Sequence, residues 1–268
     1  MTTLIAALDT FRAGTTAETV TVRGRQWKII DSGSKGPVLL MLPGTLGNAD
    51  IFFKQIQKLG KRIRIIALSS PLIADVDVIA GDIAALLDRL DIPSASILGS
   101  SFGGFLAQTF AELYPARVET LFIGNSLNNR KLMGSSLPPP DVLLKAAPKA
   151  LRVQISSQMK AWDIPEKIFA EVRDLLLREL AHHLPPRGPK LRLAAIFLRK
   201  NAPVPAVPDS QIVIIDSEDD PLISAPVRDD VCARHPKAEH HRLPSGGHFP
   251  YLTRSTAYND IITNRLGV

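Results

Sequence analysis

The chain has 268 residues, of which 45% are hydrophobic and 22% are charged, and its formal net charge is +6. This apolar content is enough to fill a folded core, which excludes a wholly disordered chain. A single cysteine, Cys232, excludes an internal disulfide and a metal cluster held by cysteines alone. The first residues lack a basic stretch, and no run of about 18 apolar residues follows. We therefore expect a cytoplasmic protein without a secretory signal or a transmembrane segment.

The positive charge belongs to one segment of the chain. Residues 128–200 contain 14 Lys and Arg against 6 Asp and Glu, whereas the rest of the chain contains 18 and 20. These basic residues are dispersed at helix-like intervals with few aromatic residues between them, so the pattern does not predict nucleic-acid binding. Two interpretations remain, a solvated helical face or a basic rim that favours anionic substrates or surfaces.

The first half of the chain alternates strand-like and helix-like segments. Residues 18–23 and 27–31 favour a β-hairpin around Gly24. Apolar residues at helical spacing predict helices over 75–90 and 105–113. Short apolar runs predict strands buried on both faces, at 38–42, 63–68, 95–98 and 118–123. This alternation predicts an α/β fold with a mainly parallel sheet that is covered by helices on both faces.

The pattern changes after Ser126. Residues 127–200 have a sequence pattern typical of helices that are separated by proline-rich segments, and they contain no convincing strand. Beyond them the sequence predicts two further strands and a closing helix, at 211–215, 239–243 and 255–266. We therefore expect an α/β core in two parts with a helical cap inserted between them, with segments 1–126, 127–200 and 201–268. Such an insertion would lie over the carboxyl ends of the strands, where α/β sites form.

The strongest chemical signal is the segment Gly99–Gly103, which matches G-x-S-x-G between a predicted strand and a predicted helix. That context defines a nucleophile elbow, whose strained turn presents Ser101 Oγ at the positive end of the helix. Ser100 does not fit the register, because Leu98 and Phe102 would occupy its glycine positions. The alternative is a glycine-rich packing turn that contains an incidental serine.

A serine hydroxyl needs a base to accept its proton. His248 lies in a glycine-containing loop between the last predicted strand and the closing helix, and it follows Ser101 in chain order as the base of this fold does. The other five histidines lie in the insertion, before a proline, or in the last predicted strand. The alternative for His248 is a loop histidine with only local hydrogen bonds.

The base in turn needs a carboxylate that fixes its tautomer and stabilises the imidazolium. Four acids follow or end the strand predicted at 211–215, namely Asp216, Glu218, Asp219 and Asp220. Carboxylates crowded in this way repel one another, so some of them must be solvated. We favour Asp220, five residues past the predicted strand end, and keep Asp219 as an alternative. A purely exposed acidic loop is the third interpretation.

Two N–H donors are needed for an oxyanion. The first candidate is the backbone N–H of Phe102, and the second comes from the loop 43–47 after a predicted strand. Pro43 has no N–H, so Thr45 is the better candidate, although this segment can also be an ordinary strand-end loop. The histidines and carboxylates lack the short spacing of metal ligands, so we expect no metal and no cofactor.

These residues and several flanking segments resemble the α/β-hydrolase fold superfamily, and within it the maspardin branch. The segments that carry the closer resemblance are 48–56, 101–108, 125–126 and 246–252. The resemblance implies that Ser101 is the nucleophile, His248 the base and Asp220 the acid, with Thr45 and Phe102 at the oxyanion hole. Two departures matter. Most relatives have His-Gly where this chain has Pro43-Gly44, and maspardin-type relatives can lose the base that this chain retains.

The expected function is that of a cofactor-independent serine hydrolase that cleaves an ester or similar acyl bond of a small molecule. The alternatives are a non-catalytic maspardin-like binding protein and an acyltransferase or cyclase that uses the same triad. The cap would supply an apolar pocket, although helical spacing does not separate pocket residues from those that pack inside the cap. The candidates are Leu143, Leu144, Trp162, Ile168, Phe169 and Leu176.

Overall fold

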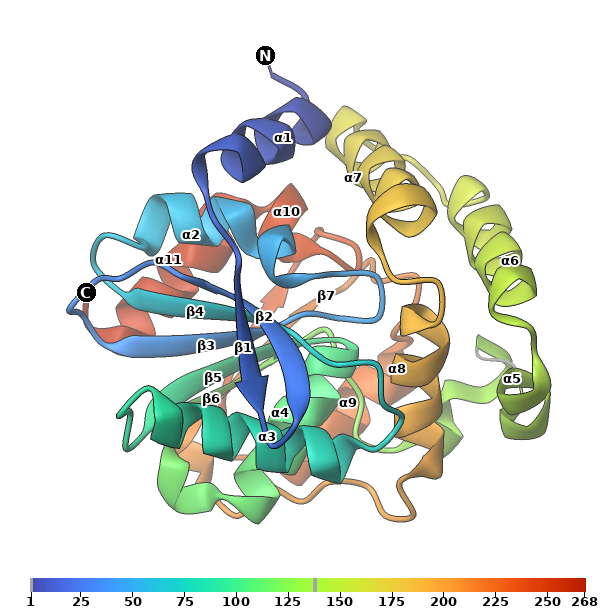
Figure 1. Ribbon diagram of the computed structural model, residues 1–268. Helices are drawn as coiled ribbons and strands as arrows, with labels where there is room; N and C mark the ends of the chain where they lie inside the picture. The colour runs from blue at the N-terminus through green and yellow to red at the C-terminus, as the bar shows by residue number, and fades with distance from the viewer. Residues whose placement is uncertain (1, 137–138) are drawn as a thin grey trace.

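A computed structural model describes residues 2–136 and 139–268 (Figure 1). Its centre is an eight-stranded sheet with the strand order β1-β2-β4-β3-β5-β6-β7-β8. The strands are β1 (Glu18–Val22), β2 (Arg25–Asp31), β3 (Val38–Leu42), β4 (Arg64–Ser69), β5 (Ala95–Ser100), β6 (Val118–Gly124), β7 (Ile212–Ser217) and β8 (Glu239–Leu243). Only β2 pairs antiparallel, with β1 and with β4, and the other described pairs are parallel. The mainly parallel sheet predicted from the sequence is confirmed.

Helices surround this sheet and fill the interval between β6 and β7. They are α1 (Leu4–Gly14), α2 (Phe53–Leu59), α3 (Val76–Arg89), α4 (Phe102–Leu113), α5 (Pro140–Lys145), α6 (Pro148–Lys160), α7 (Lys167–Arg178), α8 (Gly188–Leu198), α9 (Ala225–Arg234), α10 (Pro250–Thr253) and α11 (Ser255–Leu266). The sequence did not predict α1, α2, α9 or α10. Within the described ranges, no helix combines the length and hydropathy needed to cross a bilayer.

The central strands are apolar throughout because both faces of the sheet are covered. In β3, Leu40 and Leu42 belong to the core that α3 and α4 cover, whereas Leu39 and Met41 belong to the opposite core with α2 and α11. Successive side chains of a strand point to opposite faces, so a doubly covered strand needs an apolar residue at every position. Figure 1 shows the two pairs of helices on opposite sides of the sheet.

The helical segment between β6 and β7 contains α5 to α8. Ion pairs with α1 connect this segment to the core. Arg12 of α1 donates to both carboxylate oxygens of the buried Glu179, at 2.6 and 3.0 Å, and to Asp50 at 2.8 Å. Arg178, at the end of α7, donates to Asp9 at 2.7 Å. The N-terminal helix thus joins the helical segment to the loop region after β3.

The parallel arrangement brings four distant loops to one edge of the sheet. Strands β3, β5, β7 and β8 run in the same direction, so the loops that follow them leave from the same edge. These loops contain Thr45, Ser101, Asp220 and His248, respectively. The carboxyl ends of parallel strands are the usual position of ligand sites in α/β folds.

Candidate active site

Ser101 lies in a sharp turn between β5 and α4. Its backbone has φ 56° and ψ −121°, in the region that non-glycine residues rarely occupy. The Ser101 N–H donates to the Gly124 carbonyl at 2.9 Å, and Ser126 Oγ donates to the Ser101 carbonyl at 2.8 Å. These contacts from the end of β6 hold the strained turn in place. The helix begins at Phe102, three residues before its predicted start, so Ser101 immediately precedes it.

The glycines of the G-x-S-x-G motif permit the close approach of strand and helix. A Cβ atom on Gly99 would overlap the backbone carbonyl of Gly103, and one on Gly103 would overlap the carbonyl of Leu42 at the end of β3. A Cβ on Gly44 would lie 3.1 Å from Ser101 Cβ and 3.7 Å from its Oγ. The loop after β3 therefore lies directly against Ser101.

His248 and Asp220 are buried and hydrogen-bonded to each other. His248 Nδ1 lies 2.9 Å from Asp220 Oδ2 and 3.1 Å from Oδ1. In the tautomer that carries its proton on Nδ1, His248 donates to this carboxylate and keeps Nε2 free as an acceptor. Strand β7 ends at Ser217, two residues beyond its predicted end, so Asp220 follows the strand by three residues and not by five.

The surroundings of Asp220 keep it ionised. Burial alone raises its pKa, but the charge and hydrogen bond of His248 and the hydrogen bonds from Ile223 and Asn125 outweigh burial and lower the pKa below its usual value. The N–H groups of Leu222 and Ile223 donate to Oδ1 at 2.8 and 3.0 Å, and Asn125 Nδ2 donates to Oδ2 at 2.8 Å. Such a carboxylate accepts hydrogen bonds at both oxygens and orients the imidazole.

The neighbouring acids have separate partners, which removes the expected crowding. Asp216 belongs to β7 and accepts two hydrogen bonds from Arg242, at 2.8 and 3.2 Å. Asp219 is exposed, and its Oδ1 accepts the Gly247 N–H at 2.8 Å. Asp219 therefore contacts the loop that carries His248, whereas Asp220 contacts the imidazole itself.

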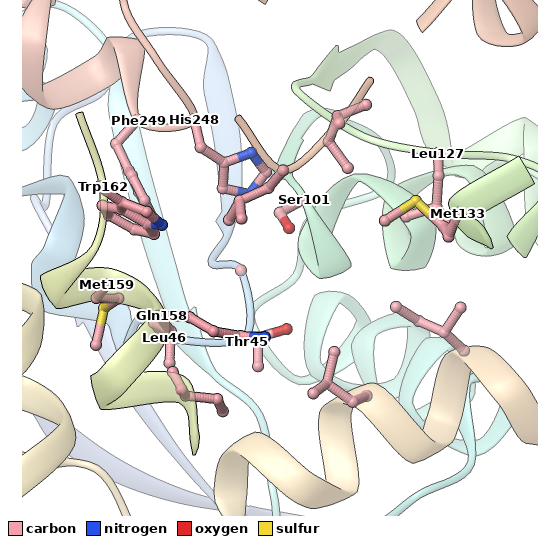
Figure 2. Close-up of a pocket in the computed structure, with 16 residues that line it drawn as sticks. Thr45, Leu46, Ser101, Leu127, Met133, Gln158, Met159, Trp162, His248 and Phe249 are labelled. Atoms are coloured by element: carbon pink, nitrogen blue, oxygen red, sulfur yellow. The ribbon is translucent and has the colours of Figure 1, made fainter. Parts of the chain in front are cut away.

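Ser101, His248 and Thr45 line one pocket with a volume of about 130 Å³. Figure 2 shows the side chains of Ser101 and His248 beside the same space, with Trp162 and Phe249 at one side and Met133 at the other. Most of the wall is apolar, and much of it comes from the helical segment, namely from Met133, Ile155, Met159, Trp162, Leu193 and Ile196. Phe102, the first residue of α4, is buried and directly follows Ser101 in the chain.

The candidate residues of the helical segment divide between the pocket wall and other environments, as the two interpretations of their helical spacing allowed. Trp162 lines the pocket, but Leu143 and Leu176 are completely buried in helix packing. Leu144 is 39% exposed to solvent. Phe169 instead lines a neighbouring cavity and lies under the guanidinium of Arg254, 5.5 Å from its ring centroid, and Ile168 packs against a core cluster.

Sequence reasoning assigned no structural role to Asn125 or Arg192. Asn125, at the end of β6, has φ 39°, and its Nδ2 donates to Asp220 at 2.8 Å and to the Gly247 carbonyl at 3.2 Å. It thus bridges the loops of Asp220 and His248. Arg192 of α8 is buried and donates to three carbonyls of the loop after β3. Neither contact leaves a signal in the sequence, because the partners are remote along the chain.

One group of side chains has the composition of a metal site. Asp216, Cys232 and His240 place ligand atoms within 4.8 Å of one another. However, Arg242 contacts both oxygens of Asp216, and His240 Nε2 lies 3.0 Å from Oδ2 of the same carboxylate. Burial, followed by the charge of Asp216, raises the pKa of the Cys232 thiol, which opposes the thiolate that a metal requires. The group is therefore arranged as a hydrogen-bonded ion-pair cluster.

The sheet and the strained serine turn define an α/β hydrolase. Residues 39–261 match the alpha/beta hydrolase family, and the chain belongs to that family. Maspardin of Homo sapiens is 28% identical over 238 residues, covering 87% of this chain and 76% of that protein. The resemblance to maspardin noted from the sequence is thereby confirmed.

Solved structures agree with this fold. A hydrolase from Pseudomonas aeruginosa PA01 has a TM-score of 0.75 at 17% identity and covers 94% of this chain and 99% of that one. An enol-lactonase from Burkholderia xenovorans LB400 has a TM-score of 0.76 at 16% identity and covers 94% and 100%. At these identities the likeness defines the fold alone, so the chemistry of this chain is argued from its own residues.

Proposed function

We propose that this protein is a serine hydrolase that cleaves an ester or a similarly activated acyl bond through an acyl-enzyme. The observation that carries the proposal is the common pocket of Ser101 and His248, with His248 Nδ1 hydrogen-bonded to the buried Asp220. Nucleophile, base and orienting carboxylate are the three parts of a catalytic triad. Hydrolases among the structural neighbours are consistent with this class of reaction.

In the acylation step, Ser101 Oγ attacks the carbonyl carbon while His248 Nε2 accepts the hydroxyl proton. Asp220 stabilises the imidazolium that forms, and the carbonyl oxygen becomes an oxyanion. The N–H groups of Phe102 and Thr45 donate to that oxyanion. His248 then protonates the leaving alcohol or thiol as the bond to the acyl carbon breaks.

In the deacylation step, water replaces the leaving group. His248 accepts a proton from the water as its oxygen attacks the acyl carbon, and it returns the proton to Ser101 Oγ when the ester bond breaks. The products are a carboxylic acid and the regenerated enzyme. Both steps, as proposed, use only the side chains and N–H groups named here, the substrate and water.

We further propose that residues 127–200 act as a cap over this site and that the enzyme works in the cytoplasm. Support for the cap comes from the pocket wall, because Met133, Met159 and Ile196 of that segment border the same space as Ser101. An apolar cover limits the access of water and strengthens the electrostatic interactions below it.

The pocket size predicts a preference for short acyl groups. An apolar cavity of about 150 Å³ holds one benzene molecule, and the pocket beside Ser101 has about 130 Å³. We expect kcat/KM for p-nitrophenyl acetate or butyrate to exceed that for the decanoate by at least about tenfold. Met159→Ala, which enlarges the wall, should reduce this preference. A kcat/KM that rises steadily from acetate to decanoate in the unmodified protein would contradict the assignment of this pocket to the acyl group.

A non-catalytic binding role is the second candidate, and the similarity to maspardin favours it. Reaction with a fluorophosphonate probe separates the two candidates, because the probe reacts with activated serines only. We expect labelling of the folded protein at Ser101 and its loss in His248→Ala. A folded wild-type protein that stays unlabelled would support the binding role. Product analysis with and without an added thiol or alcohol separates hydrolysis from acyl transfer or cyclisation.

A further inference from the structure

Arg192 has an unusual environment for a charged residue. It lies on α8 with 4% of its surface exposed, and its Nη1 donates to the carbonyls of Gly44, Thr45 and Gly47 at 3.2, 3.1 and 2.5 Å. Across residues 2–136 and 139–268, no carboxylate forms an ion pair with it. Burying a guanidinium without a counter-ion is costly unless backbone dipoles replace the solvent.

Burial lowers the pKa of Arg192 to about 10, so the guanidinium remains charged at neutral pH. Its partners are three carbonyls of one turn, in which the Gly47 N–H also donates to the Gly44 carbonyl at 3.2 Å. Hydrogen bonds from a charged donor are stronger than those between neutral groups. Arg192 therefore fixes the orientation of the peptide planes in this turn.

That orientation determines where the N–H groups of the turn point. In a trans peptide the N–H points opposite to the carbonyl of the preceding residue. The Gly44 and Thr45 carbonyls point toward Arg192, so the N–H groups of Thr45 and Leu46 point away from it. Gly44, Thr45 and Leu46 line the pocket of Ser101, whereas Arg192 lines a different cavity.

We infer that Arg192 is a positioning residue that aims the Thr45 N–H, and with it the Leu46 N–H, at the oxyanion. This role deepens the proposed hydrolase function and rests on it. Arg192 reaches the loop from the helical segment, so the geometry of the oxyanion hole depends on the docking of α8. A polar contact to this loop is thus supplied from α8.

The test compares Arg192→Met and Arg192→Lys with Arg130→Met. Arg130 is a matched control, because its Nη1 donates to carbonyls at the other end of α8, including Ile196 and Phe197 at 3.2 and 2.6 Å, and it does not contact the loop after β3. We expect Arg192→Met to lower kcat for p-nitrophenyl acetate by about 100-fold, the effect of losing one oxyanion donor. KM should change little, and Arg192→Lys should restore part of kcat.

Two further readouts separate positioning from general destabilisation. Hydrogen exchange in residues 43–48 should become faster in Arg192→Met but not in Arg130→Met, and methylguanidinium should partly restore kcat to Arg192→Ala. If Arg130→Met lowers kcat as much as Arg192→Met at a similar loss of thermal stability, or if exchange in the loop is unchanged, the inference is wrong. A wild-type protein without turnover or probe labelling would instead refute the hydrolase function, and the exchange experiment would still test the contact.

Discussion

Ser101→Ala is expected to lower kcat for a p-nitrophenyl ester by at least about 10⁴-fold, because removal of a triad nucleophile leaves only the binding and oxyanion contributions. The protein should remain folded. The φ of 56° is strained for serine and alanine alike, and the side chain of Ser101 forms no hydrogen bond within the described ranges. Ester hydrolysis followed at 400 nm and thermal unfolding together measure both expectations.

The matched control for this substitution is Ser100→Ala. Ser100 is the adjacent serine, it is buried at the end of β5, and its side chain does not line the pocket. Because it lies outside the glycine register of the elbow, we expect Ser100→Ala to keep its turnover. If turnover survives in Ser101→Ala but disappears in Ser100→Ala, the nucleophile is Ser100 and our assignment is wrong.

Asp220→Asn is expected to lower kcat by about 10⁴-fold, since an amide favours the wrong tautomer of the histidine. The exposed neighbour Asp219 provides a matched control, because it accepts a hydrogen bond from Gly247, whereas the imidazole of His248 is hydrogen-bonded to Asp220. Asp219→Asn should retain most of the activity. The opposite ranking of the two variants would transfer the role of the acid to Asp219.

The hydrogen-bonded pair of Asp220 and His248 also predicts how the stability of the protein depends on pH. The folded protein lowers the pKa of Asp220 below its usual value of about 3.9, so the ionised carboxylate stabilises the fold above that pH. This stabilisation is lost as the pH falls through the folded-state pKa. The difference in free energy of unfolding between the wild type and Asp220→Asn should therefore be largest near neutral pH and should shrink below about pH 4. Urea unfolding at several pH values measures it, and a difference that grows on acidification would contradict the assigned shift.

The strands and their order along the chain could be predicted from the sequence, because the residue patterns that indicate them are local. Each predicted strand is present with its ends within two residues. The central strands, such as 38–42, were recognisable because a doubly buried strand requires a continuous apolar run. The G-x-S-x-G turn was recognisable because its glycines are required by close backbone contacts, such as that between Gly99 and Gly103. The helices α1 and α9 were missed, although their apolar residues contact the cores.

The pocket wall and its supports could not be predicted in the same way. Apolar spacing shows that a residue of a helix is buried, but it does not show whether the residue faces another helix, as Leu176 does, or a cavity, as Met159 does. Asn125 and Arg192 act through partners far away in the chain, and their contacts exist only after the tertiary structure has formed. Their effect on Asp220 and on the loop after β3 is therefore a product of the fold.

The most direct test of the account is to trap the acyl group on the enzyme. Acid quenching during turnover of p-nitrophenyl acetate, followed by proteolysis and mass spectrometry, should find one acetyl group on the peptide that contains Ser101, and none in Ser101→Ala. His248→Ala should accumulate the adduct far more slowly, because nothing then accepts the hydroxyl proton. Acetylation at another residue, with turnover unchanged by the loss of the Ser101 hydroxyl, would contradict the proposed acyl-enzyme.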